Sequence, residues 1–377
     1  MKVLFVGGGS PATIFGLVPF ATAVRNAGHQ VFMAAPKGMA PVISASGLPA
    51  LTVTPHDFWH YLGRDRAGNP TTVPTEHRPL MEYTGSWFAQ VSADAYARLK
   101  EITARWRPDV VVGGTMCYAA PLIAARLAVP YVLQAWDASE WEWTDEGARS
   151  TLRPELDELG LDDLPTPRLR IEVTPPSMAV PRPGNVRLMR WTPGNLQCAL
   201  ESWMYARPER RRICLTAGSR ASKEHSLERL VWLAGRLQEL DAEVVVPAPE
   251  ELAAELGRRL PEVRTGWIPL DVLAPTCDVI VHHAGGATTM TALNAGVPQL
   301  IIPESVGFMA QAQLLQKLGA ALARTPEEAT GAELVRACSA LIDDPSYRQG
   351  AQALSREIAE LPPPAEFVGE LEGLARR

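Results

Sequence analysis

Short apolar runs that end in small residues recur in two series along the chain, and this pattern restricts the fold more than any other feature. The first series opens with Val3-Leu4-Phe5-Val6, which leads into Gly7-Gly8-Gly9. An apolar helical stretch follows from about Phe15 to Ala27, with Gly28 as its expected C-terminal cap, before the next run at 31–35. Runs of this kind are typical of buried parallel strands, so the strand–helix–strand order predicts an α/β fold with a parallel sheet.

Both series continue in the same way. Further strands are expected at 109–113 and 131–133 in the first series, and at 212–216, 243–246, 278–281 and 298–303 in the second. A helix is expected at about 226–240. Since 377 residues exceed the usual size of one domain, we predict two doubly wound, Rossmann-like domains, at 1–195 and 209–364, joined by a linker at 196–208. Ligands of such folds bind beyond the carboxyl ends of the strands, so we expect the site in an interdomain cleft.

Composition excludes several classes of protein. The net charge of −6 and the lack of Lys/Arg runs argue against a nucleic-acid or anionic-membrane partner. Five scattered cysteines without a C-x-x-C pair suit a reducing compartment and offer no zinc framework. The N-terminus imitates a secretory signal, but Gly7 to Pro11 interrupts its apolar stretch. We therefore predict a cytoplasmic protein, and the sequence leaves a monomer and a homodimer both open.

Aromatic side chains gather in two stretches of the first half. Residues 55–90 carry Trp59 and Trp87 among polar residues, and a second expected loop carries Trp136, Trp141 and Trp143. Long loops in compact domains are usually functional, although each ring could instead simply pack its own loop.

The sequence lacks a Walker motif, an H-E-x-x-H pair and a G-x-S-x-G elbow, and Gly7-Gly8-Gly9 does not have the spacing of a dinucleotide fingerprint. Its most informative motif is His282-His283-Ala284-Gly285-Gly286-Ala287-Thr288-Thr289, between an expected strand and an expected helix. Small residues and the N–H groups of a helix start favour a bound diphosphate. A tight turn with a packed histidine is the alternative interpretation.

Two flanking segments, Gly266 to Asp278 and Ala292 to Gln299, complete a longer pattern around this motif. Together they resemble the nucleotide-sugar signature of GT-B glycosyltransferases. The closest likeness is to bacterial enzymes that attach deoxysugars to antibiotic aglycones, particularly aromatic polyketides, and it covers essentially the whole chain.

The resemblance implies a role for each matching donor-side residue. His283 would bind the diphosphate, Trp267 would flank the base, and the Ile268 backbone would read the edge of the base. Further donors to the phosphates would be Ser219, Gly286, Ala287 and Thr288. The resemblance implies no metal and no cofactor other than the nucleotide-sugar substrate. It also implies that a C-terminal helix at 365–377 packs back on the first domain.

Two positions depart from the family pattern. The family commonly has a catalytic histidine in the first strand–helix loop, where this chain aligns Thr13, and threonine cannot act as a base near neutral pH. The family also tends to carry an Asp-Gln pair that binds sugar hydroxyls, where this chain aligns Gly307 and Phe308. A sugar lacking hydroxyls would fit these residues better, because an unpaired hydroxyl penalises binding.

Asp137, directly after the expected strand 131–133, is our candidate for the base, with Glu140 as a weaker one. The alternative is that Asp137 only caps a helix. On the acceptor side we place Thr13, His56, Trp59, Trp87 and Trp136.

The resulting hypothesis is inverting transfer of a deoxysugar from a dTDP donor to an aromatic polyketide-type acceptor, with a C-glycosidic product. The alternatives are an O-glycosyltransferase of the same family, an inactive nucleotide-sugar-binding partner protein, and a nucleotide-sugar epimerase.

Overall fold

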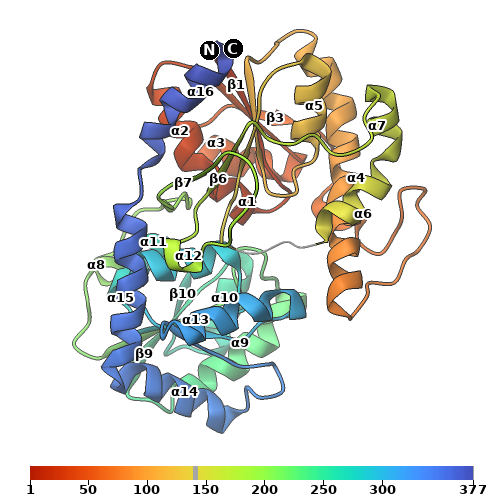
Figure 1. Cartoon of the computed structure of the whole chain (residues 1–377). Helices are drawn as coiled ribbons and strands as arrows, with labels where there is room; N and C mark the ends of the chain where they lie inside the picture. The colour runs from red at the N-terminus through yellow and green to blue at the C-terminus, as the bar shows by residue number, and fades with distance from the viewer. Residues whose placement is uncertain (139–142, 377) are drawn as a thin grey trace. The chain divides into compact units, whose positions relative to one another are not determined.

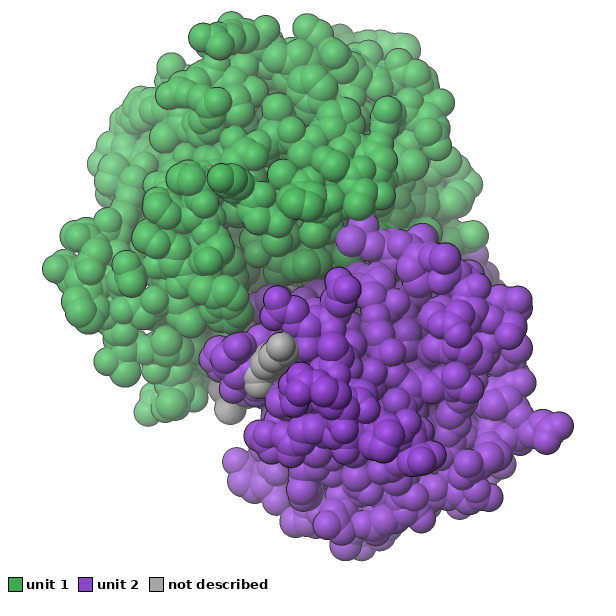
Figure 2. Space-filling model, turned by 180° about the vertical axis from the view of Figure 1, so that it is seen from behind, with its two compact units in different colours: residues 1–174, 179–194, 361–377 green, residues 175–178, 195–360 purple. Residues whose placement is uncertain are grey.

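The computed structural model describes residues 1–138 and 143–376, so the candidate Glu140 and the aromatic residue Trp141 lie outside the described residues. The chain forms two compact units, coloured separately in Figure 2. Unit 1 comprises Met1–Thr174, Ala179–Gly194 and Leu361–Arg377, and unit 2 comprises Pro175–Met178 and Asn195–Glu360. Within the described residues no helix is long and apolar enough to cross a membrane.

Unit 1 is built on a seven-stranded sheet in the order β3-β2-β1-β4-β5-β6-β7, with every neighbouring pair parallel. Its strands are β1 (Lys2–Val6), β2 (Gln30–Ala35), β3 (Ala50–Thr52), β4 (Val110–Gly114), β5 (Tyr131–Gln134), β6 (Leu169–Glu172) and β7 (Val186–Leu188). Its α-helices are α1 (Pro11–Phe15), α2 (Val18–Asn26), α3 (Ala40–Ala45), α4 (His77–Thr103), α5 (Ala119–Leu127), α6 (Thr144–Thr151), α7 (Arg153–Leu159) and α16 (Val368–Ala375), and its 3-10 helices are η1 (Lys37–Met39), η2 (Phe58–Tyr61) and η6 (Pro364–Phe367). Figure 1 labels most of these elements.

Unit 2 is built on a six-stranded parallel sheet in the order β10-β9-β8-β11-β12-β13. Its strands are β8 (Arg211–Thr216), β9 (Ala242–Pro247), β10 (Arg264–Gly266), β11 (Val279–His282), β12 (Gln299–Ile301) and β13 (Ala321–Ala323). Its α-helices are α8 (Ser202–Tyr205), α9 (Lys223–Leu237), α10 (Glu250–Arg259), α11 (Leu270–Leu273), α12 (Gly286–Asn294), α13 (Met309–Lys317), α14 (Gly331–Asp343) and α15 (Pro345–Glu360), and its 3-10 helices are η3 (Pro176–Met178), η4 (Ala274–Thr276) and η5 (Val306–Phe308).

Alternation along the strands of unit 2 explains why helices cover both faces of its sheet. Val279 and Val281 of β11 belong to one buried cluster, which includes side chains of α9, α10 and α14. Ile280, between them, belongs to a second cluster, which includes side chains of α11 and α12. Because successive strand residues point to opposite faces, a strand that is apolar at every position is buried on both sides. The predicted doubly wound architecture is therefore present in this unit.

Two expectations about helices are wrong. The stretch from Phe15 to Ala27 is not one helix, since α1 ends at Phe15 and α2 starts at Val18. Residues 77–90 of the expected long loop belong to the 27-residue helix α4, which therefore carries Trp87. Its buried face includes Met81, Gly85 and Ala89, at the four-residue spacing of a helix. Polar and aromatic residues between these positions hid that spacing.

Two glycines let α4 and α6 pack with their backbones in close approach. A Cβ atom added at Gly85 of α4 would lie 1.7 Å from the Thr144 carbonyl oxygen, and one added at Gly147 of α6 would lie 1.8 Å from the Glu82 carbonyl oxygen. The Ser86 hydroxyl donates to the Gly147 carbonyl at 3.1 Å across the same contact. The helix that carries Trp87 is thus held directly against α6.

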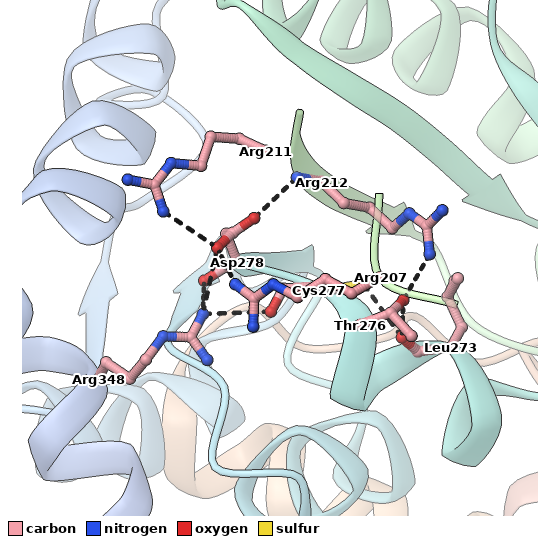
Figure 3. A network of polar contacts seen from close by, with 8 residues as sticks. All are labelled: Arg207, Arg211, Arg212, Leu273, Thr276, Cys277, Asp278 and Arg348. Atoms are coloured by element: carbon pink, nitrogen blue, oxygen red, sulfur yellow. Dashed lines mark hydrogen bonds and ion pairs between the residues drawn. The ribbon is translucent and has the colours of Figure 1, made fainter. Parts of the chain in front are cut away.

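Asp278 anchors the amino end of β11. Its carboxylate accepts a hydrogen bond from the Arg212 backbone N–H at 2.9 Å and forms ion pairs with Arg207 at 2.6 Å and Arg211 at 3.4 Å (Figure 3). Arg348 of α15 donates to the carbonyl oxygens of Cys277 and Asp278 at 3.1 and 3.0 Å. The Asp278 side chain is only 5% exposed, so these partners compensate the desolvation of its charge. They fix one end of a four-residue strand whose other end is His282.

We predict that Gly85→Ala and Gly147→Ala each lower the free energy of unfolding by about 1–3 kcal/mol, because the new methyl group collides with backbone that cannot rotate away. Gly235→Ala in α9 is the matched control. A Cβ added there meets no described atom within 4 Å, so alanine should raise stability by about 0.5–1 kcal/mol through helix propensity. Urea unfolding of the three variants measures this, and a Gly85→Ala protein as stable as wild type would contradict the packing.

Candidate functional site

The turn between β11 and α12 contains His282, His283 and the residues that start the helix, and each of these three parts of the motif has a different environment. His282 is the last residue of β11, and α12 starts at Gly286 with Gly285 as its N-cap. Between them Ala284 has φ = +70°, in the left-handed region that costs an alanine about 1–2 kcal/mol. Such strain persists only where neighbouring interactions hold it, and it is concentrated at functional sites.

His282 is a buried structural side chain. Its Nδ1 accepts a hydrogen bond from the Ala284 N–H at 3.2 Å, so the neutral ring carries its proton on Nε2. That nitrogen donates to Gln299 Oε1 at 2.8 Å, at the start of β12. Burial, together with the neighbouring His283, lowers the pKa of His282 to about 3. The packed-histidine alternative therefore describes His282.

His283 is held differently, in a slot between two glycines. A Cβ atom added at Gly218, after β8, would lie 2.6 Å from its Cε1, and one added at Gly285 would lie 2.6 Å from its Nε2. Its Nδ1 is buried and has no hydrogen-bond partner among the described residues. Burial is the main reason that its pKa is lowered; Glu304 opposes this effect and Arg220 adds to it.

The surroundings of His283 suit an anion. The first turn of an α-helix leaves N–H groups without intrahelical partners, and the first turn of α12 contains no acidic residue. Within the described part of the chain no side chain caps this helix start. A small hollow lies at the carboxyl ends of β8 and β11, and its lining includes Thr216, Arg229, His282, His283 and Glu304. N–H groups, a positive helix end and an imidazole whose Nδ1 has no partner among the described residues together can hold phosphate oxygens.

The other donor-side candidates lie elsewhere in unit 2. Ser219 directly follows Gly218, so the structure brings its turn against the His283 ring. The Trp267 indole N–H donates to the Leu196 carbonyl at 3.2 Å and its ring is half-buried, whereas the Ile268 side chain is in the core. Gly307 and Phe308 end η5, just before α13, and both are half-buried.

Ring contacts link the acceptor-side aromatic residues of unit 1. We call Phe58, Trp59, Trp87, Phe88 and Trp136 the aromatic cluster. The Phe58 ring lies 4.0 Å from that of Trp87 and 5.9 Å from that of Trp59, and Phe88 lies 6.2 Å from Trp136, measured between ring centroids. Trp59 is 53% exposed, whereas Trp136 is buried in the core. The cluster thus joins a core residue to an exposed indole.

The segment after β1, which contains α1, contacts this cluster at both ends. A Cβ at Gly9 would lie 2.8 Å from the Phe58 Cβ, and one at Gly16 would lie 2.7 Å from the Trp136 Cβ. Thr13 lies between these glycines, and its hydroxyl donates to the Ser10 carbonyl at 2.7 Å. Thr13 therefore lies in helix α1 and not in a strand–helix loop as expected, and the structure brings this helix close to the aromatic cluster.

Asp137 follows Trp136 and is 7% exposed, at the carboxyl end of β5. The residue that caps α6 is Trp143, so Asp137 is not the N-cap of that helix. His56 stacks on His60 at 3.9 Å on the surface of the unit.

Sequence reasoning missed three features of the donor side. It did not separate the roles of His282 and His283, it gave no role to Gly218, and it overlooked the charges of Arg220, Arg229 and Glu304 around the imidazole. The doubled histidine was the only available indication, because the first of the two ends a strand and the second follows it.

Comparison with known proteins gives matches over the whole chain. Residues 22–218 match the model of the Erythromycin biosynthesis protein CIII-like N-terminal domain, and residues 231–374 match that of the C-terminal domain. The chain is 30% identical to 3-alpha-mycarosylerythronolide B desosaminyl transferase of Saccharopolyspora erythraea, covering 100% of this chain and 98% of the relative. It is 31% identical to L-demethylnoviosyl transferase of Streptomyces niveus, again over 100% and 98% of the two chains.

A solved structure extends the comparison to the fold. The glycosyltransferase SsfS6 of Streptomyces sp. SF2575, complexed with thymidine diphosphate, superposes with a TM-score of 0.88 at 34% identity over 99% of each chain. The predicted fold class of two Rossmann-like α/β domains, as in GT-B enzymes, is confirmed.

The lowered pKa of His282 predicts a pH dependence of stability. The unfolded chain binds a proton near pH 6.5, but the folded ring does so only near pH 3, so stability falls as the pH is lowered through this window. The expected slope from this group is about 1.4 kcal/mol per pH unit. Urea unfolding between pH 7 and 4 measures it, and His282→Asn, which cannot titrate, should show a shallower slope. Equal slopes would contradict the buried neutral ring.

Proposed function

The chain belongs to the Erythromycin biosynthesis protein CIII-like family of glycosyltransferases, and we propose that it transfers a deoxysugar from a dTDP donor to an aromatic polyketide-type acceptor. One observation carries the proposal. The half-buried His283 ring lies between Gly218 and Gly285, its Nδ1 is buried without a hydrogen-bond partner among the described residues, and the turn leads into the uncapped start of α12. This arrangement supports binding of a diphosphate.

The donor half of the proposal assigns the nucleotide to unit 2. His283 and the N–H groups of Gly286, Ala287 and Thr288 bind the phosphates, and Ser219 adds a hydroxyl. Trp267 flanks the base and the Ile268 backbone reads its edge. The thymidine diphosphate bound by SsfS6 supports thymidine as the nucleoside.

The sugar half rests on Gly307 and Phe308. Neither side chain can hydrogen-bond a sugar hydroxyl, so a hydroxyl facing them loses its water without gaining a partner. A deoxygenated sugar avoids that loss. The name desosaminyl transferase, carried by the Saccharopolyspora relative, supports this class of donor.

The acceptor half assigns a flat aromatic molecule to unit 1. Trp59 offers an exposed indole face at the end of the aromatic cluster, and offset stacking on such a face favours planar rings. His56 and Trp87 flank this surface, while Trp136 and Thr13 support it from within.

The reaction follows from these assignments. Asp137 takes the phenolic proton of the acceptor, and a ring carbon of the phenolate attacks the anomeric carbon from the face opposite the diphosphate. The bond from the anomeric carbon to the diphosphate oxygen breaks and its electron pair leaves with dTDP. The attacked ring carbon then loses its proton to solvent, which restores the aromatic ring as a phenolate, and Asp137 returns the first proton to the phenolate oxygen. The configuration inverts. His283 and the start of α12 stabilise the charge that develops on the departing diphosphate, without a metal ion.

We predict that His283→Ala weakens dTDP binding about 10- to 100-fold, the range for one hydrogen bond to a charged group. Gly285→Ala should have a similar effect because the methyl group displaces the ring, and alanine suits the φ of −61° at this position. Isothermal titration calorimetry with dTDP and UDP tests this, with Gly235→Ala as the control that keeps wild-type affinity. Unchanged affinity in His283→Ala would remove the donor assignment.

We predict that Asp137→Asn lowers turnover at least 100-fold, the usual share of a general base, while dTDP affinity is retained. The assay supplies a dTDP-deoxysugar and a panel of polyketide phenols, and follows the product by mass spectrometry. The wild-type product should survive acid hydrolysis, as a C-glycoside does; an acid-labile product indicates the O-glycosyltransferase. Binding without turnover indicates an inactive partner protein, and conversion of the donor without acceptor indicates an epimerase.

A further inference from the structure

The backbone at Ala284 is held in place by a side chain that the proposed reaction does not use. Ala284 has a positive φ and is buried, between the residue that faces the hollow and the N-cap of α12. The conformation is unfavourable for alanine, so an interaction must compensate for it. The hydrogen bond from the Ala284 N–H to His282 Nδ1 is positioned to do so.

His282 is itself fixed from its other side. Its Nε2 bonds to the Gln299 side chain, which is fully buried, and β11 pairs with β12 through His282 and Ile301. The ring therefore connects the strained turn to the neighbouring strand, and it has no freedom to rotate without losing both bonds.

The slot around His283 tolerates little movement. The glycines on both of its sides are so close that a single added carbon would overlap the ring. A change in the Ala284 torsion would move the ring toward one of these glycines. The same change would tilt the first N–H groups of α12, because Gly285 follows directly.

We propose that His282 is a positioning residue for the diphosphate site: by accepting the Ala284 N–H, it sets the left-handed turn that aims both the His283 ring and the start of α12. The inference rests on the proposed role of His283 in binding the donor diphosphate. His282 itself is almost fully buried and acts through the turn that follows it.

Two substitutions separate the two hydrogen bonds of the ring. In His282→Asn the amide oxygen takes the place of Nδ1 and can still accept the Ala284 N–H. In His282→Gln the amide nitrogen takes the place of Nε2 and can still donate to Gln299, but the Ala284 N–H loses its acceptor. Each variant leaves one buried group unpaired, so we expect similar losses of thermal stability from the two.

Affinity for dTDP, measured by isothermal titration calorimetry at pH 7.5, should differ between them. We expect His282→Asn to bind within about threefold of wild type and His282→Gln at least tenfold more weakly. In a His283→Ala background the His282→Gln change should weaken dTDP binding by a smaller factor than in the wild-type background, because only the start of α12 is left for it to position. With saturating acceptor, the effect in His282→Gln should appear mainly in the donor KM and less in kcat.

Several results would overturn the inference. Equal weakening of dTDP binding by both variants would show that the His282 ring contributes to stability alone. Wild-type dTDP affinity in both variants would show that the turn at Ala284 needs no support from His282. If His282→Gln fails to fold, His282→Asn still tests the inference. A more than tenfold loss of dTDP affinity in His282→Asn would contradict it, because this variant keeps the hydrogen bond from the Ala284 N–H. A wild-type protein that does not bind dTDP refutes the proposed function instead, which keeps the two failures distinct.

Discussion

The candidate donor site depends on two residues without side chains, Gly218 and Gly285. They leave a slot one imidazole wide between the end of β8 and the start of α12, and His283 fills it. Because β8 and β11 are parallel neighbours, the turns that follow both strands lie at the same edge of the sheet. The fold thus brings a glycine from one turn against a histidine from the next, across more than sixty residues of sequence.

The amino end of β11 is held by ion pairs, whereas its carboxyl end carries a neutral, buried histidine. At the amino end, Asp278 is surrounded by arginine side chains and a backbone N–H, so its buried charge is fully compensated. At the carboxyl end, burial keeps His282 neutral and the strand ends in a strained turn. The firm anchor limits sliding of a four-residue strand, so the strain at the other end is not relieved by a shift in register.

The central strands of both units could be predicted from the sequence because buried parallel strands are continuous apolar runs, as in Val3–Val6 and Val279–Val281. The short strands towards the edges of the sheets, β3, β6, β7, β10 and β13, were not predicted, because they are only three or four residues long. The motif around His283 was also visible, since small residues and a helix start leave a local pattern. The helical position of Trp87 was not, because the buried positions of α4 nearest to it are Gly85 and Ala89 rather than large apolar residues. The Gly85–Gly147 packing could not be predicted either, because it depends on two helices that meet only in the folded chain.

The separate roles of His282 and His283 show why a motif alone cannot assign a site. Adjacent histidines look equivalent in sequence. In the fold, the alternation of β11 points the His282 side chain into the protein, whereas His283 lies in the turn that follows the strand. Two buried polar atoms without partners among the described residues, His283 Nδ1 and Gln299 Nε2, lie on either side of His282. Natural proteins satisfy most buried polar groups and tolerate strain mainly where function requires it. An imidazole nitrogen without a partner among the described residues, next to a left-handed alanine, is therefore the feature on which we base the proposed donor site, rather than the well-satisfied Asp278 network.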